Sequence, residues 1–357
     1  MLKKVLALLL ASSMTLSLAA CGGSAKSNNA AASGAASGAS SAAATSGKAV
    51  TLNFSHTQAP NSVSDMAAKE FKRIIEEKSA GSIKVNIVTN CGLSGGDLTK
   101  ALEMTTAGDI DIHAAAPTNA ANFDPRFYIF WMPFLFPTMD SLLKVCQSEE
   151  IYNAVDGWCA DMNMKMLGFH NAGARQLSNS KKEIRTPEDL KGMNIRVPGA
   201  QLFIDLYRDC FGANPTAMDF SEVYTALQQK TIDGQENPVS VFDSSKFNEV
   251  QKYITQWDYV RDTTAWFMSK KTMDKLSAEQ QTMVLDAAKQ ALDWANTYVT
   301  ENEEEIVKKL EEEGVTVTKL SPEEQKAFAD AAAPLYEKYT ETIGKDVIDL
   351  FQKVANG

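Results

Sequence analysis

The chain has 357 residues, of which 44% are hydrophobic, and its formal net charge is -10. This length is too great for one small hydrophobic core, so two domains are expected. The acidic balance, with no concentrated basic face, argues against nucleic acid as a partner, because phosphate binding requires clustered Lys and Arg. An anionic ligand would therefore need a local positive site.

Residues 1–20 have the pattern of a secretory signal. Two lysines precede a short apolar run at residues 5–10, which is too short to span a bilayer. The run leads to Leu-Ala-Ala-Cys at residues 18–21, and small residues just before a cysteine resemble the lipobox of bacterial lipoproteins. We therefore expect an acylated Cys21 that anchors the protein to the outer side of a membrane, on the periplasmic side or at the cell surface. The alternative is a chance cysteine behind an ordinary signal peptide.

Residues 21–48 comprise this cysteine and a segment rich in Gly, Ser and Ala, with almost no large apolar side chain. Such a composition buries too little apolar surface to offset the entropy lost on ordering. The segment is predicted to be a flexible tether, and the folded part is expected to start near Ala49.

From residue 50 onward, strand-like and helix-like patterns alternate along the chain. Strands show apolar alternation, whereas helices show apolar side chains at helical spacing or a capping signal. In chain order the patterns are a strand at 50–54, a helix at 65–78, strands at 83–88 and 164–169, a helix start at 186–189, a strand at 194–197 and a helix from 201. The alternation predicts an α/β fold.

One predicted helix is much longer than the others. Residues 277–280 read Ser-Ala-Glu-Gln, which is a capping box, and apolar side chains keep helical spacing as far as Gly314. A polar run at residues 300–305 interrupts this stripe. A helix of this length would extend about 50 Å. We expect one helix that packs on both domains; two helices separated by a kink are the alternative.

One motif suggests an enzyme. Residues 92–96 read Gly-Leu-Ser-Gly-Gly, which matches the G-x-S-x-G elbow of α/β hydrolases. That fold requires an acid and then a histidine after the serine, and no histidine follows His170. We therefore favour a glycine-rich helix entrance beginning at Asp97, and predict that the protein is not an enzyme. A lipid-anchored extracytoplasmic hydrolase using Ser94 is the alternative.

The remaining cysteines and histidines show no metal-ligand spacing. The cysteines form no C-x-x-C pair, and a role as small buried hydrophobes is expected for each. We predict no metal and no cofactor, and the sequence assigns no disulfide. These residues are Cys91, Cys146, Cys159, Cys210, His56, His113 and His170.

An arginine interrupts the apolar strand pattern at residues 194–197. Arg196 points away from its two apolar neighbours by strand alternation, and Pro198-Gly199 ends the strand directly after it. Ligands of open α/β sheets bind outside the carboxyl ends of strands, and a guanidinium matches a carboxylate with two parallel hydrogen bonds. Arg196, with Arg175, is therefore a candidate carboxylate anchor. A salt bridge between strands or helices is the alternative role.

Four segments occur in the order and spacing of a known family. They are MPFLFP (132–137), RTPEDLKGMNIRVPGA (185–200), FGANPTAMDFSEVYTALQQKTIDGQENP (211–238) and FNEVQKYI (247–254). Their combination resembles the extracytoplasmic solute receptors of tripartite ATP-independent periplasmic (TRAP) transporters, a family that includes C4-dicarboxylate and sialic acid receptors. The similarity extends over nearly all of residues 50–345.

The resemblance implies four main ligand contacts. Arg196 matches the arginine that forms the principal bidentate salt bridge with the ligand's carboxylate, and Arg175 matches a second positive contact. Phe220 matches the aromatic residue that packs on the ligand, and Asn237 matches the amide that hydrogen-bonds its carboxylate. A helix staple is the alternative role for Phe220, with Asp219 or Ser221 as the cap, and a plain turn is the alternative for Asn237.

Other positions depart from the sialic acid receptors. Ala114-Ala115-Ala116-Pro117 stands where those receptors have a glutamate, Gly199 where they have an asparagine, and Tyr259 where many members have a histidine. A small, partly apolar or less hydroxylated acid is therefore favoured, and uronates stay open. Asp97, Tyr259 and His56, with its neighbour Thr57, are additional candidate contacts.

The implied fold has two discontinuous α/β lobes joined by hinge strands. The lobes are expected over 49–172 plus about 261–300, and over 173–260 plus about 301–345, with the helix at 277–314 bracing both. The ligand's carboxylate binds between the lobes, which then close, and a membrane permease recognises the closed form. A sensor kinase is the alternative partner.

Overall fold

The computed structural model describes residues 48–357. The predicted signal peptide, Cys21 and nearly all of the predicted tether lie outside the described residues. Among residues 48–357, no helix is both long enough and apolar enough to cross a membrane.

The described residues form one nine-stranded sheet, which runs in the order β2-β1-β3-β8-β4-β7-β5-β6, with β9 paired to β8. The strands are β1 (Val50–His56), β2 (Ile83–Val88), β3 (Ile112–Ala115), β4 (Met164–Asn179), β5 (Asn194–Val197), β6 (Asn214–Ala217), β7 (Gly234–Pro238), β8 (Tyr253–Ser269) and β9 (Thr316–Lys319). The predicted α/β class is confirmed, and strands occur at each of the four predicted places.

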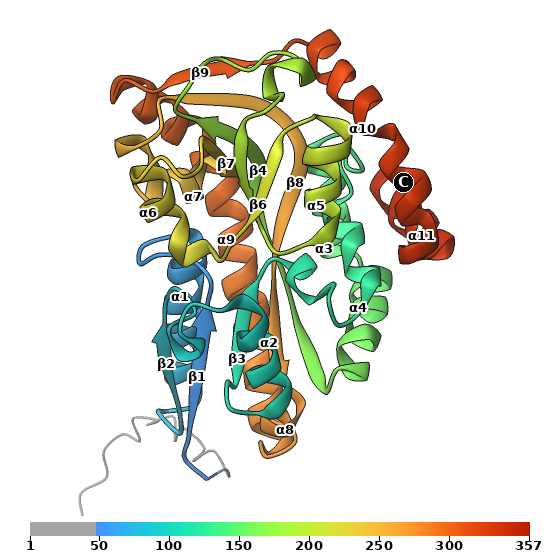
Figure 1. Cartoon of the computed structure of the whole chain (residues 1–357). Helices are drawn as coiled ribbons and strands as arrows, with labels where there is room; N and C mark the ends of the chain where they lie inside the picture. Colours follow the sequence, from blue (N-terminus) through green and yellow to red (C-terminus); the bar gives the residue numbers. More distant parts are fainter. Residues whose placement is uncertain (1–47) are drawn as a thin grey trace, which may run out of the picture. The chain divides into compact units, whose positions relative to one another are not determined.

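Two long antiparallel strands, β4 and β8, connect the two parts of the sheet (Figure 1). Strands β1, β2 and β3 pair in parallel at one end, and β5, β6 and β7 lie at the other. The register between β4 and β8 shifts at three places, one of them between Asn171 and Gly173, and Gly173 has a positive φ of 95°. Such irregularities bend a strand, so these two strands have the character of hinges.

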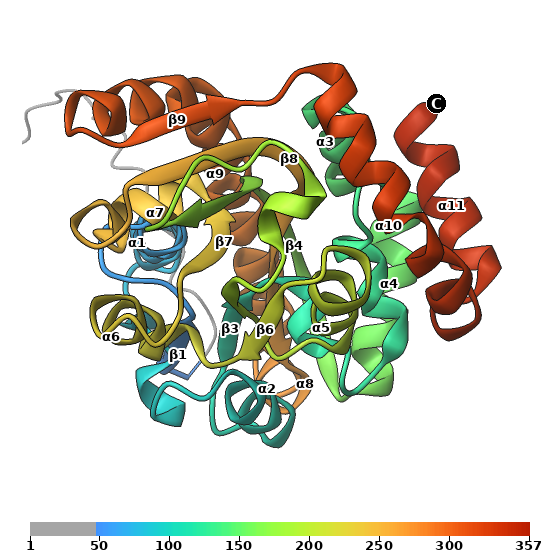
Figure 2. The same cartoon turned by 45° about the horizontal axis from the view of Figure 1, so that its top comes forward.

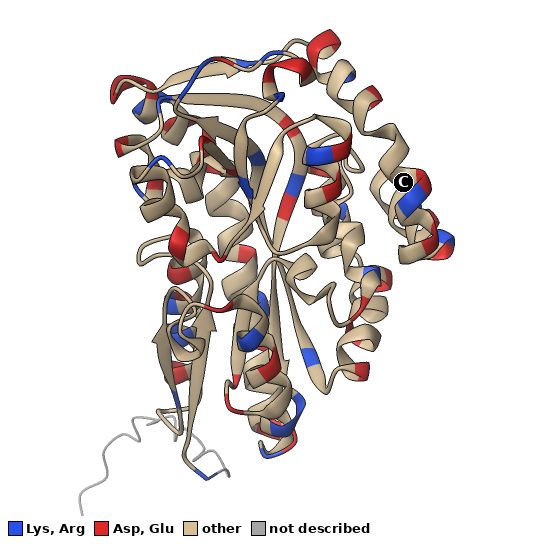
Figure 3. Ribbon diagram, in the orientation of Figure 1, with Lys and Arg blue, Asp and Glu red and all other residues tan. Residues whose placement is uncertain are grey.

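Helices cover both sides of this sheet: Figure 2 shows the C-terminal helices α10 and α11 beside α3 and α4 on one side, and α1, α7 and α9 on the other. The helices are α1 (Val63–Lys78), α2 (Leu98–Ala107), α3 (Met139–Gln147), α4 (Glu149–Asp161), α5 (Gln201–Asp205), α6 (Val223–Gln228), α7 (Val239–Ser244), α8 (Lys270–Met273), α9 (Ala278–Glu312), α10 (Pro322–Ile343) and α11 (Lys345–Asn356). Basic and acidic residues are interspersed over the helices and loops (Figure 3).

Helix α9 is one continuous helix, so the alternative of two helices is wrong. Ser277 caps it: its Oγ accepts from the backbone N of Gln280 at 3.2 Å, and the side chain of Gln280 accepts from the backbone N of Ser277 at 3.1 Å. Val284 packs in the core around α1, whereas Leu310 packs in the core around α6 and α7. The helix therefore braces both parts of the sheet.

Candidate functional site

A small cavity of about 50 Å³ lies where the carboxyl ends of β5 and β7 meet the middle of β4 and β8. Loops from the β1–β3 end of the sheet close its other side. Its lining residues are Thr57, Gln58, Leu98, Ala116, Asn119, Trp131, Ala172, Arg175, Arg196, Pro198, Phe220, Asn237, Pro238, Val241, Asp262 and Thr264. The four main predicted contacts, Arg175, Arg196, Phe220 and Asn237, therefore meet in one cavity together with the additional candidate Thr57, although they come from separate elements.

Arg196 is a buried cation at the end of β5, with 2% of its surface exposed. Its Nε and Nη2 both donate to the carbonyl oxygen of Met218, at 3.0 and 2.8 Å, and its guanidinium lies 5.8 Å from the ring centre of Phe220. No ion pair joins Arg196 to any carboxylate within residues 48–357, so the alternative role as a strand-to-strand salt bridge is not seen there. Burial lowers the pKa of Arg196 to about 10, against the opposing field of Glu236.

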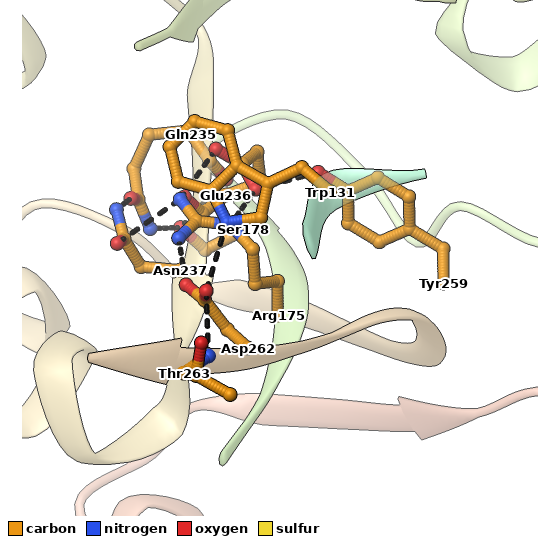
Figure 4. Close-up of polar contacts among 9 residues, drawn as sticks. All are labelled: Trp131, Arg175, Ser178, Gln235, Glu236, Asn237, Tyr259, Asp262 and Thr263. Carbon is orange, nitrogen blue, oxygen red and sulfur yellow. Dashed lines mark hydrogen bonds and ion pairs between the residues drawn. The ribbon is translucent and has the colours of Figure 1, made fainter. Parts of the chain in front are cut away.

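Arg175, on β4, is also buried but has two acidic partners (Figure 4). Its Nε and Nη2 form an ion pair with the carboxylate of Glu236, and its Nη1 donates to Oδ2 of Asp262 at 2.5 Å. Trp131 stacks 4.9 Å from the guanidinium carbon. Burial alone would lower the pKa of Arg175, but the two carboxylates hold it well above its usual value. Its charge is thus balanced by the protein, which the sequence pattern could not show.

Glu236 and Asn237 are consecutive residues of β7, and both accept hydrogen bonds from the guanidinium of Arg175 (Figure 4). Oδ1 of Asn237 accepts from Nη2 of Arg175 at 3.2 Å, and its Nδ2 donates to Oε1 of Gln235 at 2.6 Å. In addition to its bonds with Arg175, Glu236 accepts a hydrogen bond, at 2.5 Å, from the hydroxyl of Tyr259. Tyr259 is fully buried and is not among the cavity-lining residues; its partner Glu236 in turn pairs with the lining residue Arg175.

Phe220 begins a short 3-10 helix, Phe220–Glu222, that lacks a side-chain cap. The proposed helix-capping role of Asp219 is therefore not seen: its Oδ1 instead accepts from the backbone N of Leu98 at 3.4 Å. The ring of Phe220 lies between Phe247, 6.0 Å away between ring centres, and the guanidinium of Arg196. It thus forms an apolar wall beside the cation.

The two remaining candidates lie outside the cavity lining. Asp97 is exposed and caps α2, where its side chain accepts from the backbone N of Lys100 at 2.8 Å. His56 is fully buried beneath the first loop; its Nδ1 accepts from the backbone N of Gln58 at 3.3 Å. It is Thr57 and Gln58 of this loop that reach the cavity.

The hydroxyl of Ser94 helps to hold a turn of the backbone. Ser94 is buried, and its hydroxyl lies within hydrogen-bond distance of the carbonyl oxygens of Cys91, at 2.9 Å, and Asp97, at 2.6 Å. The helix entrance predicted at Asp97 is confirmed by the start of α2. These bonds hold a turn in which Cys91 and Gly95 have positive φ.

The cysteines and histidines do not gather at a metal site. Cys91, Cys146, Cys159 and Cys210 are free thiols, two of them buried and two partly exposed. Across the described range, no group of three or more His, Cys, Asp and Glu side chains is arranged to hold a metal ion.

Several lining residues were missed by the sequence reasoning. Asp262 holds Arg175 and also accepts, at 2.8 Å, from Nε1 of Trp131, while Gln58 and Asn119 add neutral polar groups. The segment Arg-Asp-Thr-Thr at residues 261–264 shows two charges and two hydroxyls inside a strand, which was an available signal. Gln58 lies in a loop and Asn119 in the short 3-10 helix Pro117–Ala120, and neither segment shows such a pattern.

Residues 54–342 match the family described as bacterial extracellular solute-binding protein, family 7 (DctP). The sialic acid-binding periplasmic protein SiaP of Vibrio cholerae is 31% identical over 302 residues, which cover 84% of this chain and 91% of SiaP.

Solved structures agree with this match. A TRAP periplasmic solute-binding protein from Ralstonia eutropha H16, with bound (S)-2-acetolactate, has a TM-score of 0.82 and 29% identity, covering 86% of this chain and 98% of its own. A second, from Shewanella oneidensis with bound succinate, has a TM-score of 0.80 and 27% identity, covering 86% and 99%. The chain therefore belongs to the DctP family of TRAP solute-binding proteins, which are extracytoplasmic receptors and not enzymes.

Proposed function

We propose that the protein is a lipid-anchored receptor that captures an organic acid through a salt bridge between Arg196 and the ligand's carboxylate. It then delivers the acid to the membrane permease of a TRAP transporter. The observation that carries this proposal is the buried guanidinium of Arg196, which lines a cavity and has no acidic partner among the described residues. Dicarboxylates, keto acids and sugar acids are the candidate ligands, in line with the acids bound to related proteins.

The donors of Arg196 support a bidentate contact. Nε and one hydrogen of Nη2 are used by the carbonyl of Met218, while Nη1 and the second hydrogen of Nη2 have no acceptor within residues 48–357. One N–H of Nη1 and the free N–H of Nη2 are parallel to each other and match the two oxygens of a carboxylate. Each charge-assisted bond contributes about 1.5–3 kcal/mol where water is excluded. A buried cation without a counter-ion is costly, so an incoming anion removes a penalty as well as adding bonds.

Calorimetric titration of Arg196 variants tests this proposal, using the tightest acid from a thermal-shift screen of organic acids. Arg196→Ala should weaken binding by roughly 2–5 kcal/mol, and Arg196→Lys should not restore it, because an ammonium lacks the planar fork. Arg73→Ala, which removes an exposed arginine of α1, is the matched control. Wild-type affinity in Arg196→Ala would overturn the anchor role.

The lipid anchor is supported by the lipobox-like Leu-Ala-Ala-Cys at residues 18–21. Acylation of Cys21 would hold the receptor beside its permease, with the segment up to Lys48 as the tether. Expression of the full chain should give a membrane-bound protein, and Cys21→Ala should release it. An equal membrane-bound fraction in both forms would exclude this anchor. Genes for two membrane subunits beside this one would favour the permease over a sensor kinase as partner.

A further inference from the structure

We infer that the ligand is a compact monocarboxylic acid with a hydroxyl group on its body, and that Gln58 recognises this hydroxyl. The inference rests on the proposed salt bridge with Arg196. It goes beyond that proposal in two ways: it states that the ligand carries a single carboxylate, and it names the residue that recognises the uncharged part of the ligand.

The first observation is the charge balance around the cavity. The charged lining residues are Arg175, Arg196 and Asp262, and Glu236 lies directly behind them. Arg175 is committed to both carboxylates, which leaves Arg196 as the one lining cation without an acidic partner in the described chain. A second ligand carboxylate would therefore be buried without a counter-ion, at a cost that a neutral polar group does not incur.

The opposite wall of the cavity is neutral and polar. Thr57 and Gln58 of the loop after β1 and Asn119 of the 3-10 helix Pro117–Ala120 line it, and Thr264 of β8 adds a further neutral polar group to the lining. Oε1 of Gln58 is buried and has no hydrogen-bond partner in the described part of the chain. Buried polar atoms in folded proteins are nearly always hydrogen-bonded, so the unpartnered amide oxygen indicates that a ligand group completes this site.

A hydroxyl is the group that suits this amide. The unpartnered oxygen requires a donor, and a carboxylate or keto oxygen has no proton to donate. The apolar neighbours Leu98, Ala116 and Val241, together with the volume of about 50 Å³, favour a short carbon skeleton.

His56 holds Gln58 in place as a positioning residue. Nδ1 of His56 accepts from the backbone N of Gln58 at 3.3 Å, and its Nε2 lies 3.5 Å from Oδ1 of Asp65. The other oxygen of Asp65 accepts from the backbone N of Asn61, at 2.6 Å, and from Nζ of Lys69, at 2.7 Å. The loop that carries Gln58 is thus tied at both ends to α1. His56, predicted as a ligand contact, is given a supporting role by this arrangement.

A set of four acids on one four-carbon skeleton tests separately whether the ligand carries a single carboxylate and whether it carries a hydroxyl. Butanoate has one carboxylate, 2-hydroxybutanoate adds the hydroxyl, succinate adds the second carboxylate, and malate adds both. Calorimetry on the purified protein should show the tightest binding for 2-hydroxybutanoate. Butanoate and succinate should each bind at least about tenfold more weakly, because one lacks the hydroxyl and the other buries an unpaired charge.

The variant Gln58→Ala should remove the preference for the hydroxyl: 2-hydroxybutanoate should fall to the affinity of butanoate, while butanoate should be unchanged. Gln229→Ala, which alters an exposed glutamine, is the matched control. Three results would overturn the inference. They are an equal loss of affinity for butanoate and 2-hydroxybutanoate in Gln58→Ala, binding of succinate as tight as that of 2-hydroxybutanoate, and no binding of any of the four acids. The proposed function fails separately, if Arg196→Ala binds these acids as the wild type does.

Discussion

The two buried arginines of the cavity differ in how their charges are compensated. Arg175 has two carboxylate partners within the protein, whereas Arg196 has a backbone carbonyl and an aromatic ring. Removing one partner of a buried ion pair leaves an uncompensated charge, but removing an unpaired buried charge leaves none. The same substitution should therefore destabilise the protein at Arg175 but not at Arg196.

Methionine at each position makes this difference measurable. Arg175→Met should lower the free energy of unfolding of the ligand-free protein by about 3–5 kcal/mol, because Glu236 and Asp262 lose their cation. Arg196→Met should leave it unchanged or raise it, since a desolvated guanidinium is removed. Urea unfolding of both variants beside the wild type is the measurement. Losses of similar size in the two variants would show that Arg196 is compensated by the fold.

The cavity could be predicted only in part, and these residues show why. Arg196 stood out because a guanidinium at the end of an apolar strand conflicts with local pattern. The partners of Arg175 stand 61 and 87 residues further along the chain, on β7 and β8. No local pattern connects such positions, and strand pairing alone brings them together. Gln58 was missed for a related reason: loops have no periodic pattern, so a polar residue in a loop does not stand out.

At the scale of elements, the polar run of α9 lies against the bend of the two long strands. Glu303 accepts a hydrogen bond from the backbone N of Ala174, and it shares a surface pocket with Asp258 of β8 and Arg261. Burial raises the pKa of Glu303 from 4.5 to about 7, and the nearby carboxylate of Asp258 adds to this shift. The interruption of the apolar stripe is thus a contact with the hinge region.

This pKa implies a pH-dependent stability. A carboxyl whose folded pKa is raised stabilises the fold fully below its unfolded value of 4.5, and this contribution is lost as pH rises through about 7. Glu303→Gln imitates the protonated form, so it should match the wild type near pH 4.5 and exceed it by about 1–3 kcal/mol near pH 8.

The difference in the free energy of unfolding between the wild type and Glu303→Gln, measured as a function of pH, isolates the contribution of Glu303. It removes the opposing contribution of His113 and His170, whose pKa values burial lowers to about 3 and about 4. Glu312→Gln, in the exposed last turn of α9, is the control. A Glu303→Gln curve parallel to the wild type at all pH values would refute the raised pKa.

The bounds of helices and strands were predicted well where the local sequence carries both a capping signal and a regular apolar pattern. The helix expected over residues 65–78 begins two residues earlier, at Val63, because Ser62 caps it: its Oγ accepts from the backbone N of Asp65 at 3.3 Å. The strand predicted over residues 164–169 continues to Asn179. That extension carries Asn, Gly, Arg and Gln, which break apolar alternation, and only pairing with β7 and β8 keeps it extended.

At the scale of the whole molecule, contacts cross the cavity mouth between the two predicted lobes. The backbone N of Leu98 donates to Oδ1 of Asp219 at 3.4 Å. Gly96 also approaches Ser221 closely: a Cβ at Gly96, whose φ is 95°, would lie only 2.7 Å from Oγ of Ser221. Segments 121 residues apart in the sequence therefore touch beside the cavity, and separation of the lobes would break these contacts. The described structure has the arrangement expected of a closed receptor.

Closure in solution should depend on the ligand, because a ligand shifts a conformational equilibrium only through contacts that are better in one state. Arg196 lies on β5, whereas Thr57 and Gln58 reach the cavity from the loop after β1, so an acid that contacts both favours the closed form. Small-angle scattering should show a smaller radius of gyration at saturating acid. Arg196→Ala should not compact at the same acid concentration, whereas the control Arg73→Ala should compact as the wild type does. Identical scattering with and without acid in the wild type would mean that the lobes do not close on the ligand.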